Sequence, residues 1–466
     1  IDKATGTNTD RDSLQLLLKV VGTGDLVVIK SIDEQSNSLV NIGRDTLLIK
    51  SVLVNEEVLV RTTYQSKNYW NCIVVKVLKP SKLRTKSFCD ISNVCGSCSY
   101  AHVNYDNQLI IKKKQVSRLF IDAKLDVVVN DVIGMSSPYN YRNKMIMGFG
   151  YNKSRQVVKG LYEENSHRIV QCDSCSLHDP ECDKIFNTIY RLVKKYKMPI
   201  FNEDKHTGLL RHVLIRKAIV TKEILVVIVV ASDVFPGRKN FVSELLKAHS
   251  NITSIVQNVN ARNTSVVLGN DERTLYGKGY ITDILCGLKF SISDSSFYQI
   301  NHKLTEILYN LAISNLNLSK TETLFDSYCG IGTIGLIASK SVATVESVEI
   351  NADAIKDAIL NAKINNISNV KFTCGDAEII MQRMAADHAK IDALIMDPPR
   401  SGATNSFLDA VIKLRPKKIS YVSCNPVTLV RDLVYLSKYY SFNVVDLVDM
   451  FPHTTHVEAV VLLTKI

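Results

Sequence analysis

The sequence has no long apolar run. Its longest apolar stretches, such as EILVVIVVA from Glu223 to Ala231, are much shorter than the roughly 20 residues that a membrane-spanning helix needs. Transmembrane helices are therefore excluded. The early residues Asp2 to Asp12 are polar and lack an apolar signal core, so we expect no secretion signal in them. Internal repeats and low-complexity tracts are also absent.

Cysteine is sparse. Eleven cysteines in 466 residues are too few for a disulfide scaffold. Their odd number, without a secretion signal, favours a reducing and therefore cytoplasmic compartment. Thiol chemistry or metal ligation is the role to test for them.

Acidic residues are fewer than basic ones. The chain has 57 Lys and Arg against 46 Asp and Glu, a net charge of +11. This balance favours a polyanionic partner such as nucleic acid, and the alternative is a basic surface that only maintains solubility. The hydrophobic share of 46% and the charged share of 22% are typical of folded globular proteins. At about 100–200 residues per domain, the length predicts two to four domains.

The first two segments differ in pattern. Short strands separated by polar turns predict a small barrel of the oligonucleotide-binding type at residues 20–80. Residues 81–290 mix strands with helices, which predicts an α+β middle domain. A helical period near residues 101–128 predicts a helix that can pack on the C-terminal domain.

The C-terminal segment, residues 291–466, has the most regular pattern. From Glu322 onward, strands and helices alternate. This alternation predicts an α/β fold with a doubly wound, Rossmann-like parallel sheet. Ligands of such sheets bind at the carboxyl ends of the strands.

A glycine-rich turn follows the first strand of that sheet. The motif DSYCGIGTIG runs from Asp326 to Gly335, and its glycines allow a tight turn and a close approach of the backbone to a ligand. Glu349 ends the second strand, where a carboxylate can hold both ribose hydroxyls. An NAD-dependent dehydrogenase would show the same features, so this region predicts only a nucleoside-bearing cofactor. The alternative is a simple turn with a solvated Glu349.

Chemically active residues stand at one end of each of three later strands. Asp397 stands at the end of IDALIMD before two prolines that fix the backbone. Cys424 follows ISYVS, where helix dipoles are expected to lower its thiol pKa for nucleophilic attack; a buried cysteine without a reaction is the alternative. Glu458 begins a last strand after His453 and His456, but these three residues do not make a convincing zinc ligand set.

Four blocks together carry a specific resemblance. FDSYCGIGTIGL, MDPPRSGA, YVSCNPVTLVRDL and MFPHTTHVEAVVLL resemble the signature blocks of the SAM-dependent RNA 5-methyluridine methyltransferases. DSSFYQIN, YRNKM and GLLRHVLIR also resemble that family's pattern, so the likeness extends over about residues 80–466. The N-terminal segment is more loosely similar to the family's TRAM domain, an RNA-binding β-barrel. The resemblance implies a class I SAM-dependent methyltransferase domain at the C-terminus.

The resemblance also implies site residues. Cys424 would be the nucleophile that adds to carbon 6 of uridine, and Glu458 the base that removes the proton from carbon 5. The cofactor S-adenosyl-L-methionine (SAM) would lie against five residues: Gln299, Tyr328, Glu349, Asp376 and Asp397. The uridine would have to be flipped out of its stack.

The cysteine spacing permits two metal sites. Cys89, Cys95 and Cys98, with the later Cys172-x2-Cys175 pair, are compatible with a zinc site built from two CxxC pairs. The resemblance instead implies a 4Fe-4S cluster held by Cys89, Cys95, Cys98 and Cys175. We expect the 4Fe-4S cluster, and we expect its role to be structural.

The expected partner is RNA. Members with a TRAM domain and a cluster mostly modify large-subunit (23S-type) ribosomal RNA, so rRNA is favoured over tRNA. We expect a monomer, with phosphate contacts from Lys82, Arg84 and Lys112 to Lys114. The alternatives are an NAD-dependent oxidoreductase and a catalytically inactive RNA-binding relative.

Overall fold

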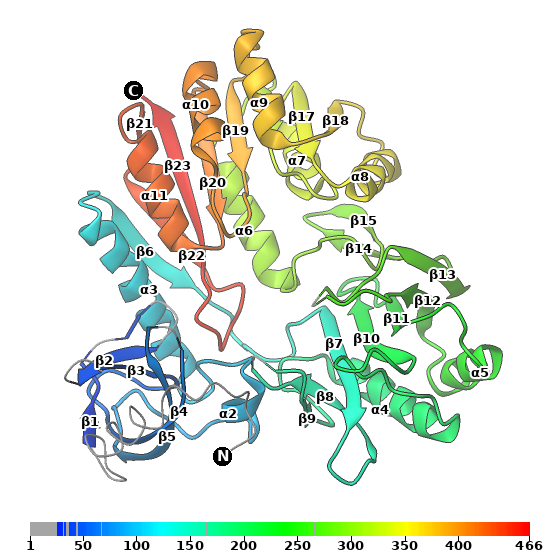
Figure 1. Ribbon diagram of the computed structural model, residues 1–466. Coiled ribbons are helices and arrows are strands. Elements are labelled where there is room, and N and C mark those ends of the chain that lie inside the picture. The colour runs from blue at the N-terminus through cyan, green and yellow to red at the C-terminus, as the bar shows by residue number, and fades with distance from the viewer. Residues whose placement is uncertain are drawn as a thin grey trace. The chain divides into compact units, whose positions relative to one another are not determined.

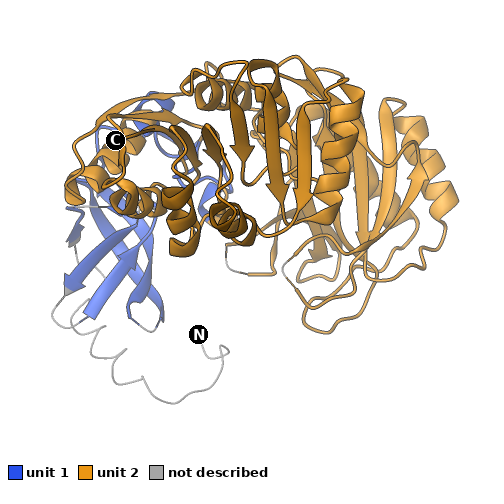
Figure 2. Ribbon diagram, turned by 90° about the horizontal axis from the view of Figure 1, so that it is seen from above, with its two compact units in different colours: residues 1–93, 98–108, 453–455 blue, residues 94–97, 109–452, 456–466 orange. Residues whose placement is uncertain are grey.

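The computed structural model describes residues 26–30, 32–33, 37–42, 45–66, 68–164, 166–264 and 266–466. The expectation for Asp2 to Asp12 concerns residues outside these ranges. Two compact units are present (Figure 2): residues 1–93, 98–108 and 453–455 form unit 1, and the remaining residues form unit 2. No helix in the described part of the chain is long and apolar enough to cross a membrane.

Unit 1 contains a five-stranded sheet. Its strands are β1 (Leu26–Val28), β2 (Ser38–Ile42), β3 (Asp45–Ile49), β4 (Glu57–Gln65) and β5 (Trp70–Lys79), in the order β1-β4-β5-β3-β2 (Figure 1). Its core includes Val58, Val60 and Trp70. Two helices follow, α2 (Ser92–Cys95) and α3 (Tyr105–Asp122).

A seven-stranded sheet forms the first half of unit 2. Its order is β13-β12-β11-β10-β7-β8-β9. The strands are β7 (Lys144–Tyr151), β8 (Val157–Tyr162), β9 (Ile169–Gln171), β10 (Leu210–Lys217), β11 (Ile224–Val230), β12 (Ile252–Val259) and β13 (Asp271–Tyr276). Strand β11 is buried along its whole length, which explains its continuous apolar run. Helices α4 (Pro180–Lys195) and α5 (Arg238–Ala248) pack on one face of the sheet, where their apolar side chains share a core with Met145 and Met147.

The C-terminal half of unit 2 is the predicted doubly wound sheet. Its order is β18-β17-β16-β19-β20-β23-β22-β6, and β21 pairs with β23. The strands are β6 (Val128–Ile133), β16 (Thr323–Asp326), β17 (Thr344–Glu349), β18 (Val370–Cys374), β19 (Ala393–Met396), β20 (Lys418–Ser423), β21 (Tyr440–Ser441), β22 (Val444–Val448) and β23 (Glu458–Lys465). A hairpin of β14 (Ile281–Leu285) and β15 (Leu288–Ile292) precedes this sheet in the sequence.

Helices cover both faces of this sheet. One core contains residues of α6 (His302–Ser314), α7 (Thr333–Ala338) and α8 (Ala352–Ile364). The other contains residues of α9 (Ala377–Ala386), α10 (Asn405–Leu414) and α11 (Pro426–Leu436), together with Val116 and Phe120 of α3. The predicted α/β class is confirmed. Strand β6 pairs with β22, so the sheet also uses a segment that the sequence pattern assigned to the middle domain.

Candidate functional site

Five parallel strands end at one edge of the C-terminal sheet. Strands β16 to β20 run parallel, and the antiparallel β23 begins at the same edge. The pairing of β20 with β23 ends at Ser423 and Ala459, so Cys424 and Glu458 come next on neighbouring strands. The edge therefore collects most of the predicted site residues: Tyr328, Glu349, Asp376, Asp397, Cys424 and Glu458.

The glycine-rich turn is tied to two acidic side chains. The amide of Gly330 donates to Glu349 Oε2 over 3.1 Å, and the amide of Gly335 donates to Asp326 Oδ2 over 3.0 Å. Gly332 has a φ of +82°, and a Cβ there would lie 3.1 Å from the ring of Phe372, so a glycine is required. The first bond fixes the turn against the end of β17, and the second fixes it against the end of β16.

The remaining predicted cofactor residues surround this turn. The Tyr328 ring packs on Phe407 with centroids 5.6 Å apart. Gln299 is buried, its backbone oxygen accepts from Asn143 Nδ2 over 2.8 Å, and its side chain bonds to the Tyr309 hydroxyl. Asp376 caps α9 by accepting from the Glu378 amide over 2.8 Å. All three residues are therefore held in fixed positions.

Asp397, Cys424 and Glu458 form an electrostatically coupled group. Burial raises the pKa of Asp397 to about 7. Burial, reinforced by the Asp397 charge, raises the pKa of Glu458 to about 8, while Arg400 lowers it. Glu458 is only 3% exposed. A carboxyl with a pKa near neutrality is suited to proton transfer.

The Cys424 thiol differs from the expectation. Burial, reinforced by the charges of Glu458 and Asp397, raises its pKa to about 11, although Arg400 lowers the pKa by charge and by a hydrogen bond. The predicted lowering of this pKa by helix dipoles is therefore wrong. The desolvation cost of a thiolate is larger than the helix-dipole effect at this position, so the resting group is a thiol.

The loop after Asp397 is anchored to helix α11. Asn425 Nδ2 donates to the Arg400 carbonyl over 2.9 Å, and the Ala403 amide donates to Asp432 Oδ2 over 2.9 Å. Gly402 has a φ of +76°, and a Cβ there would lie 2.6 Å from Arg431 Nη2. This packing fixes Asp397 and Arg400 relative to Cys424, which immediately precedes Asn425.

Three further residues contact this site and were not predicted from the sequence as site residues. Asp326 is buried and its pKa rises to about 7 because of burial. Arg400 interacts with both Cys424 and Glu458, and Tyr309 bonds to Gln299. Asp326 and Arg400 lie inside quoted motifs, where their positions at strand ends were the available signal. Tyr309 lies in helix α6 and gave no signal in the sequence.

The described residues do not assemble either of the two predicted metal sites. Among them, no group of three or more His, Cys, Asp or Glu side chains has a geometry that could hold a metal ion. None of the cysteines in the described ranges forms a disulfide. Cys89 and Cys98 belong to unit 1, whereas Cys95 and Cys175 belong to unit 2. The structure therefore does not show a fit between these four thiols and a cluster.

One of the expected phosphate contacts is wrong, and a second cation already has protein partners. Lys112 is fully buried and its Nζ lies 2.5 Å from Asp449 Oδ1. Arg84 donates through Nη2 to Glu56 Oε2 over 2.7 Å and to the Ser51 carbonyl over 2.8 Å. These two cations stabilise the fold, because buried charges require partners. Lys114, by contrast, is exposed.

A family model and two relatives identify proteins similar to this chain, and all of them are described as RNA methyltransferases. Residues 104–466 match the family model described as tRNA (uracil-5-)-methyltransferase. A Staphylococcus aureus protein described as an uncharacterized RNA methyltransferase is 37% identical over 444 residues, which cover 95% of this chain and 97% of that one. A Clostridium tetani protein with the same description is 38% identical over 425 residues, 91% of this chain and 92% of that one.

A solved structure is similar over nearly the whole chain. It is the Pyrococcus abyssi tRNA (uracil-54, C5)-methyltransferase in complex with S-adenosyl-L-homocysteine. The likeness has a TM-score of 0.75 and 25% identity, and covers 94% of this chain and 100% of that chain.

Proposed function

This chain belongs to the tRNA (uracil-5-)-methyltransferase family, the SAM-dependent RNA methyltransferases that act on carbon 5 of uracil, and from that premise we propose that it uses Cys424 as a covalent nucleophile and Glu458 as the proton acceptor. The observation that carries the proposal is the meeting of these two residues with Asp397 at the sheet edge.

The residues around the glycine turn fit the cofactor. SAM supplies an electrophilic methyl group when it is bound. Glu349 at the end of β17 is placed to accept the ribose hydroxyls, once its bonds to the Gly330 and Asn351 amides adjust. Gln299, Tyr328, Asp376 and Asp397 complete the proposed binding set, and their fixed positions limit the entropy lost on binding.

Cys424 activates the uridine in the proposed mechanism. Carbon 5 of uridine is too weak a nucleophile to accept a methyl group directly. Cys424 first loses its thiol proton to water, and the resulting thiolate sulfur bonds to carbon 6; the electron pair of the 5,6 double bond moves into an enolate, and carbon 5 becomes nucleophilic. Carbon 5 then bonds to the methyl group as the methyl–sulfonium bond breaks.

Glu458 ends the reaction. Its carboxylate takes the proton from carbon 5, the double bond re-forms, and the bond between carbon 6 and the Cys424 sulfur breaks. In the ligand-free protein the raised pKa of Glu458, about 8, leaves much of this group protonated at neutral pH. Arg400 lowers the pKa of both Glu458 and Cys424, and therefore favours their active forms.

A denaturing gel separates the two roles. Glu458→Ala should add to RNA and methylate it but fail to release it, so a protein–RNA adduct should accumulate. Cys424→Ala should bind RNA and SAM but form no adduct and no 5-methyluridine. Turnover by Cys424→Ala would contradict the nucleophile assignment, and normal turnover by Glu458→Ala would require a different base.

For the target we propose large-subunit ribosomal RNA. The family resemblance of the N-terminal β domain and the cysteine spacing support this choice. Transfer RNA is the second candidate, because the similar P. abyssi enzyme acts on uracil 54 of tRNA. Mapping 5-methyluridine in rRNA and tRNA from cells that lack the protein distinguishes them: the missing modification identifies the substrate.

We also propose the 4Fe-4S cluster on Cys89, Cys95, Cys98 and Cys175, because the cysteine pattern resembles that of the cluster-bearing members of the family. Protein purified without oxygen should then be brown, and Cys175→Ser should lose the colour. A colourless protein with one equivalent of zinc would contradict the assignment. Retention of the cluster in Cys175→Ser would instead move the fourth ligand to Cys172.

The domain roles remain part of the proposal. Residues 20–80 would act as a TRAM-like RNA-binding domain, residues 81–290 as the middle domain and residues 291–466 as the methyltransferase domain of a cytoplasmic monomer. Deletion of residues 1–80 should weaken RNA binding and leave SAM binding nearly unchanged. RNA affinity should fall with salt by roughly 0.7 log unit per log unit of salt for each single-strand phosphate contact. Equal RNA affinity of the truncated protein would contradict the anchoring role.

A further inference from the structure

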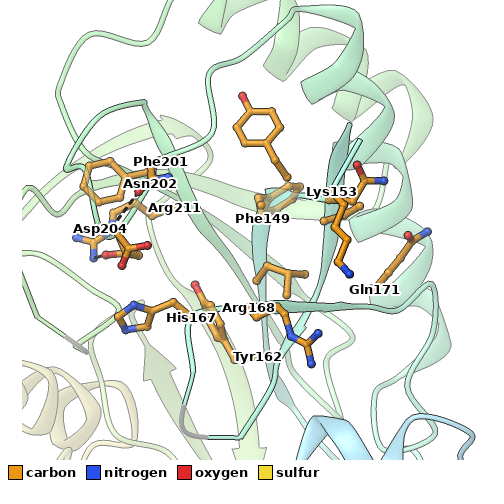
Figure 3. Close-up of a pocket in the computed structure, with 16 residues that line it drawn as sticks. Phe149, Lys153, Tyr162, His167, Arg168, Gln171, Phe201, Asn202, Asp204 and Arg211 are labelled. Atoms are coloured by element: carbon orange, nitrogen blue, oxygen red, sulfur yellow. Dashed lines mark hydrogen bonds and ion pairs between the residues drawn. The ribbon is translucent and has the colours of Figure 1, made fainter. Parts of the chain in front are cut away.

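A cavity that the catalytic mechanism does not use lies in the seven-stranded sheet (Figure 3). Its volume is about 400 Å³, within the roughly 300–1,000 Å³ range of small-ligand sites. Strands β7, β8 and β9 and the segment 201–204 form its walls. In Figure 3, Phe201, Asn202 and Arg211 lie on one side, with Lys153 and Gln171 on the opposite side.

The walls combine aromatic rings with cations. Four aromatic residues line the cavity, Phe149, Tyr151, Tyr162 and Phe201, together with Lys153, His167 and two arginines that are ion-paired, Arg168 with Glu163 and Arg211 with Glu203. Single-stranded RNA is bound in this way, because unstacked bases pack on aromatic rings or on guanidinium planes while cations attract the phosphates.

A glycine makes room for the Tyr162 ring beside the cavity. Gly148 of β7 pairs with Gly160 of β8 and with His212 of β10. A Cβ on Gly148 would lie 2.7 Å from Ile169 Cδ1 and 3.0 Å from Tyr162 Cζ. The missing side chain therefore lets the Tyr162 ring lie against the sheet.

The polar groups around Tyr162 are held in place. Its hydroxyl lies 3.3 Å from His212 Nδ1, and burial keeps His212 neutral by lowering its pKa to about 4. The Arg211 guanidinium lies 4.7 Å above the Phe201 ring and is paired with Glu203 at 2.7 Å. The carboxylates of Glu203 and Asp204 can accept the exocyclic amino group of a base such as adenine.

We propose that this cavity binds an unstacked nucleobase of the RNA substrate, separate from the uridine that is methylated, with Tyr162 as the stacking surface. A second bound nucleotide would fix the RNA while the target uridine is held at the sheet edge. The inference rests on the proposed function only in taking RNA as the substrate, since it requires neither Cys424 chemistry nor a particular target.

Poly(A) tests this inference, because it contains no uridine and so measures base binding apart from methyl transfer. Tyr162→Ala should weaken poly(A) binding by roughly 5- to 150-fold, the range expected for the loss of one stacked base. Tyr162→Phe keeps the ring and should bind within about twofold of wild type. The control Tyr276→Ala removes a partly exposed ring of the same sheet outside the cavity and should bind as wild type.

SAM affinity and melting temperature, measured on every variant, verify that unit 2 remains folded. Ultraviolet cross-linking to poly(A) should place a nucleotide on a peptide that contains Tyr162 or Phe201. Wild-type poly(A) affinity in folded Tyr162→Ala would overturn the inference, as would an equal loss in Tyr276→Ala. If wild type binds poly(A) through Tyr162 but methylates no uridine, the proposed function fails and this inference stands.

Discussion

Replacement of Glu458 by Gln should make the stability of the protein less sensitive to pH. Burial raises the pKa of Glu458 from 4.5 to about 8, and each tenfold change in an acid constant corresponds to about 1.4 kcal/mol. In the unfolded chain the group ionises above pH 4.5, but in the folded chain it ionises only above about pH 8. The wild-type free energy of unfolding should therefore fall across this window, by at most about 5 kcal/mol from this one group.

Urea denaturation of the full chain between about pH 5 and pH 9 measures this effect. The stability of Glu458→Gln relative to wild type should increase as the pH rises through the window and remain constant above pH 8. The exposed Asp387, changed to Asn, provides the control and should give a difference that does not depend on pH. A pH-independent difference for Glu458→Gln would refute the claim that this carboxyl is buried in its neutral form.

Three further predictions concern the sheet edge and its support. The wild-type kcat/KM for methyl transfer should rise between about pH 7 and pH 9. Glu458 has a pKa of about 8 and must lose its proton to act as a base. A pH-rate profile measures this rise, and a flat profile would argue for another base. Lys112→Met should lower the free energy of unfolding by about 3–5 kcal/mol, because it removes the ammonium beside the buried Asp449 carboxylate. In urea denaturation, the Lys112→Met, Asp449→Leu double variant should regain part of this lost free energy. A small loss of stability in Lys112→Met alone would show that the ion pair contributes little. Gly402→Ala should reduce turnover about tenfold, because a Cβ there would lie 2.8 Å from Asp432 Oδ2 and 2.9 Å from the Thr428 Cβ, and the resulting shift would displace Asp397 and Arg400 from Cys424. Gly287→Ala has a similar φ of +75° and open space, so it should retain activity. Equal turnover of the two variants would show that the Gly402 packing is unimportant.

The sequence predicted the C-terminal domain well, because its strands are continuous apolar runs that end in polar residues. Asp397 was found in this way, and Glu458 was found at the start of the last strand; both lie at the predicted edge of the sheet. The pattern failed where burial decides the chemistry. Lys112 reads as part of a basic surface run, yet it is buried against Asp449, which is 337 residues away in the sequence. No local pattern reports such a contact.

The same limit applies to Cys424 and to the cavity of the middle sheet. The position of Cys424 before α11 predicted a low thiol pKa, but burial and two neighbouring carboxyls raise that pKa to about 11. Those neighbours come from β19 and β23, so their effect requires the tertiary fold. Likewise, Phe201 and Tyr162 lie in separate segments, and only the folded sheet makes them line one cavity.

The covalent bond between Cys424 and RNA is the most direct test of the account. The adduct of Glu458→Ala, digested with nuclease and protease, can be analysed by mass spectrometry. We expect a peptide containing Cys424 whose sulfur carries a uridine nucleotide with one additional methyl group. A nucleotide attached to a different residue, or complete methylation of RNA without any adduct in this variant, would contradict the proposed mechanism.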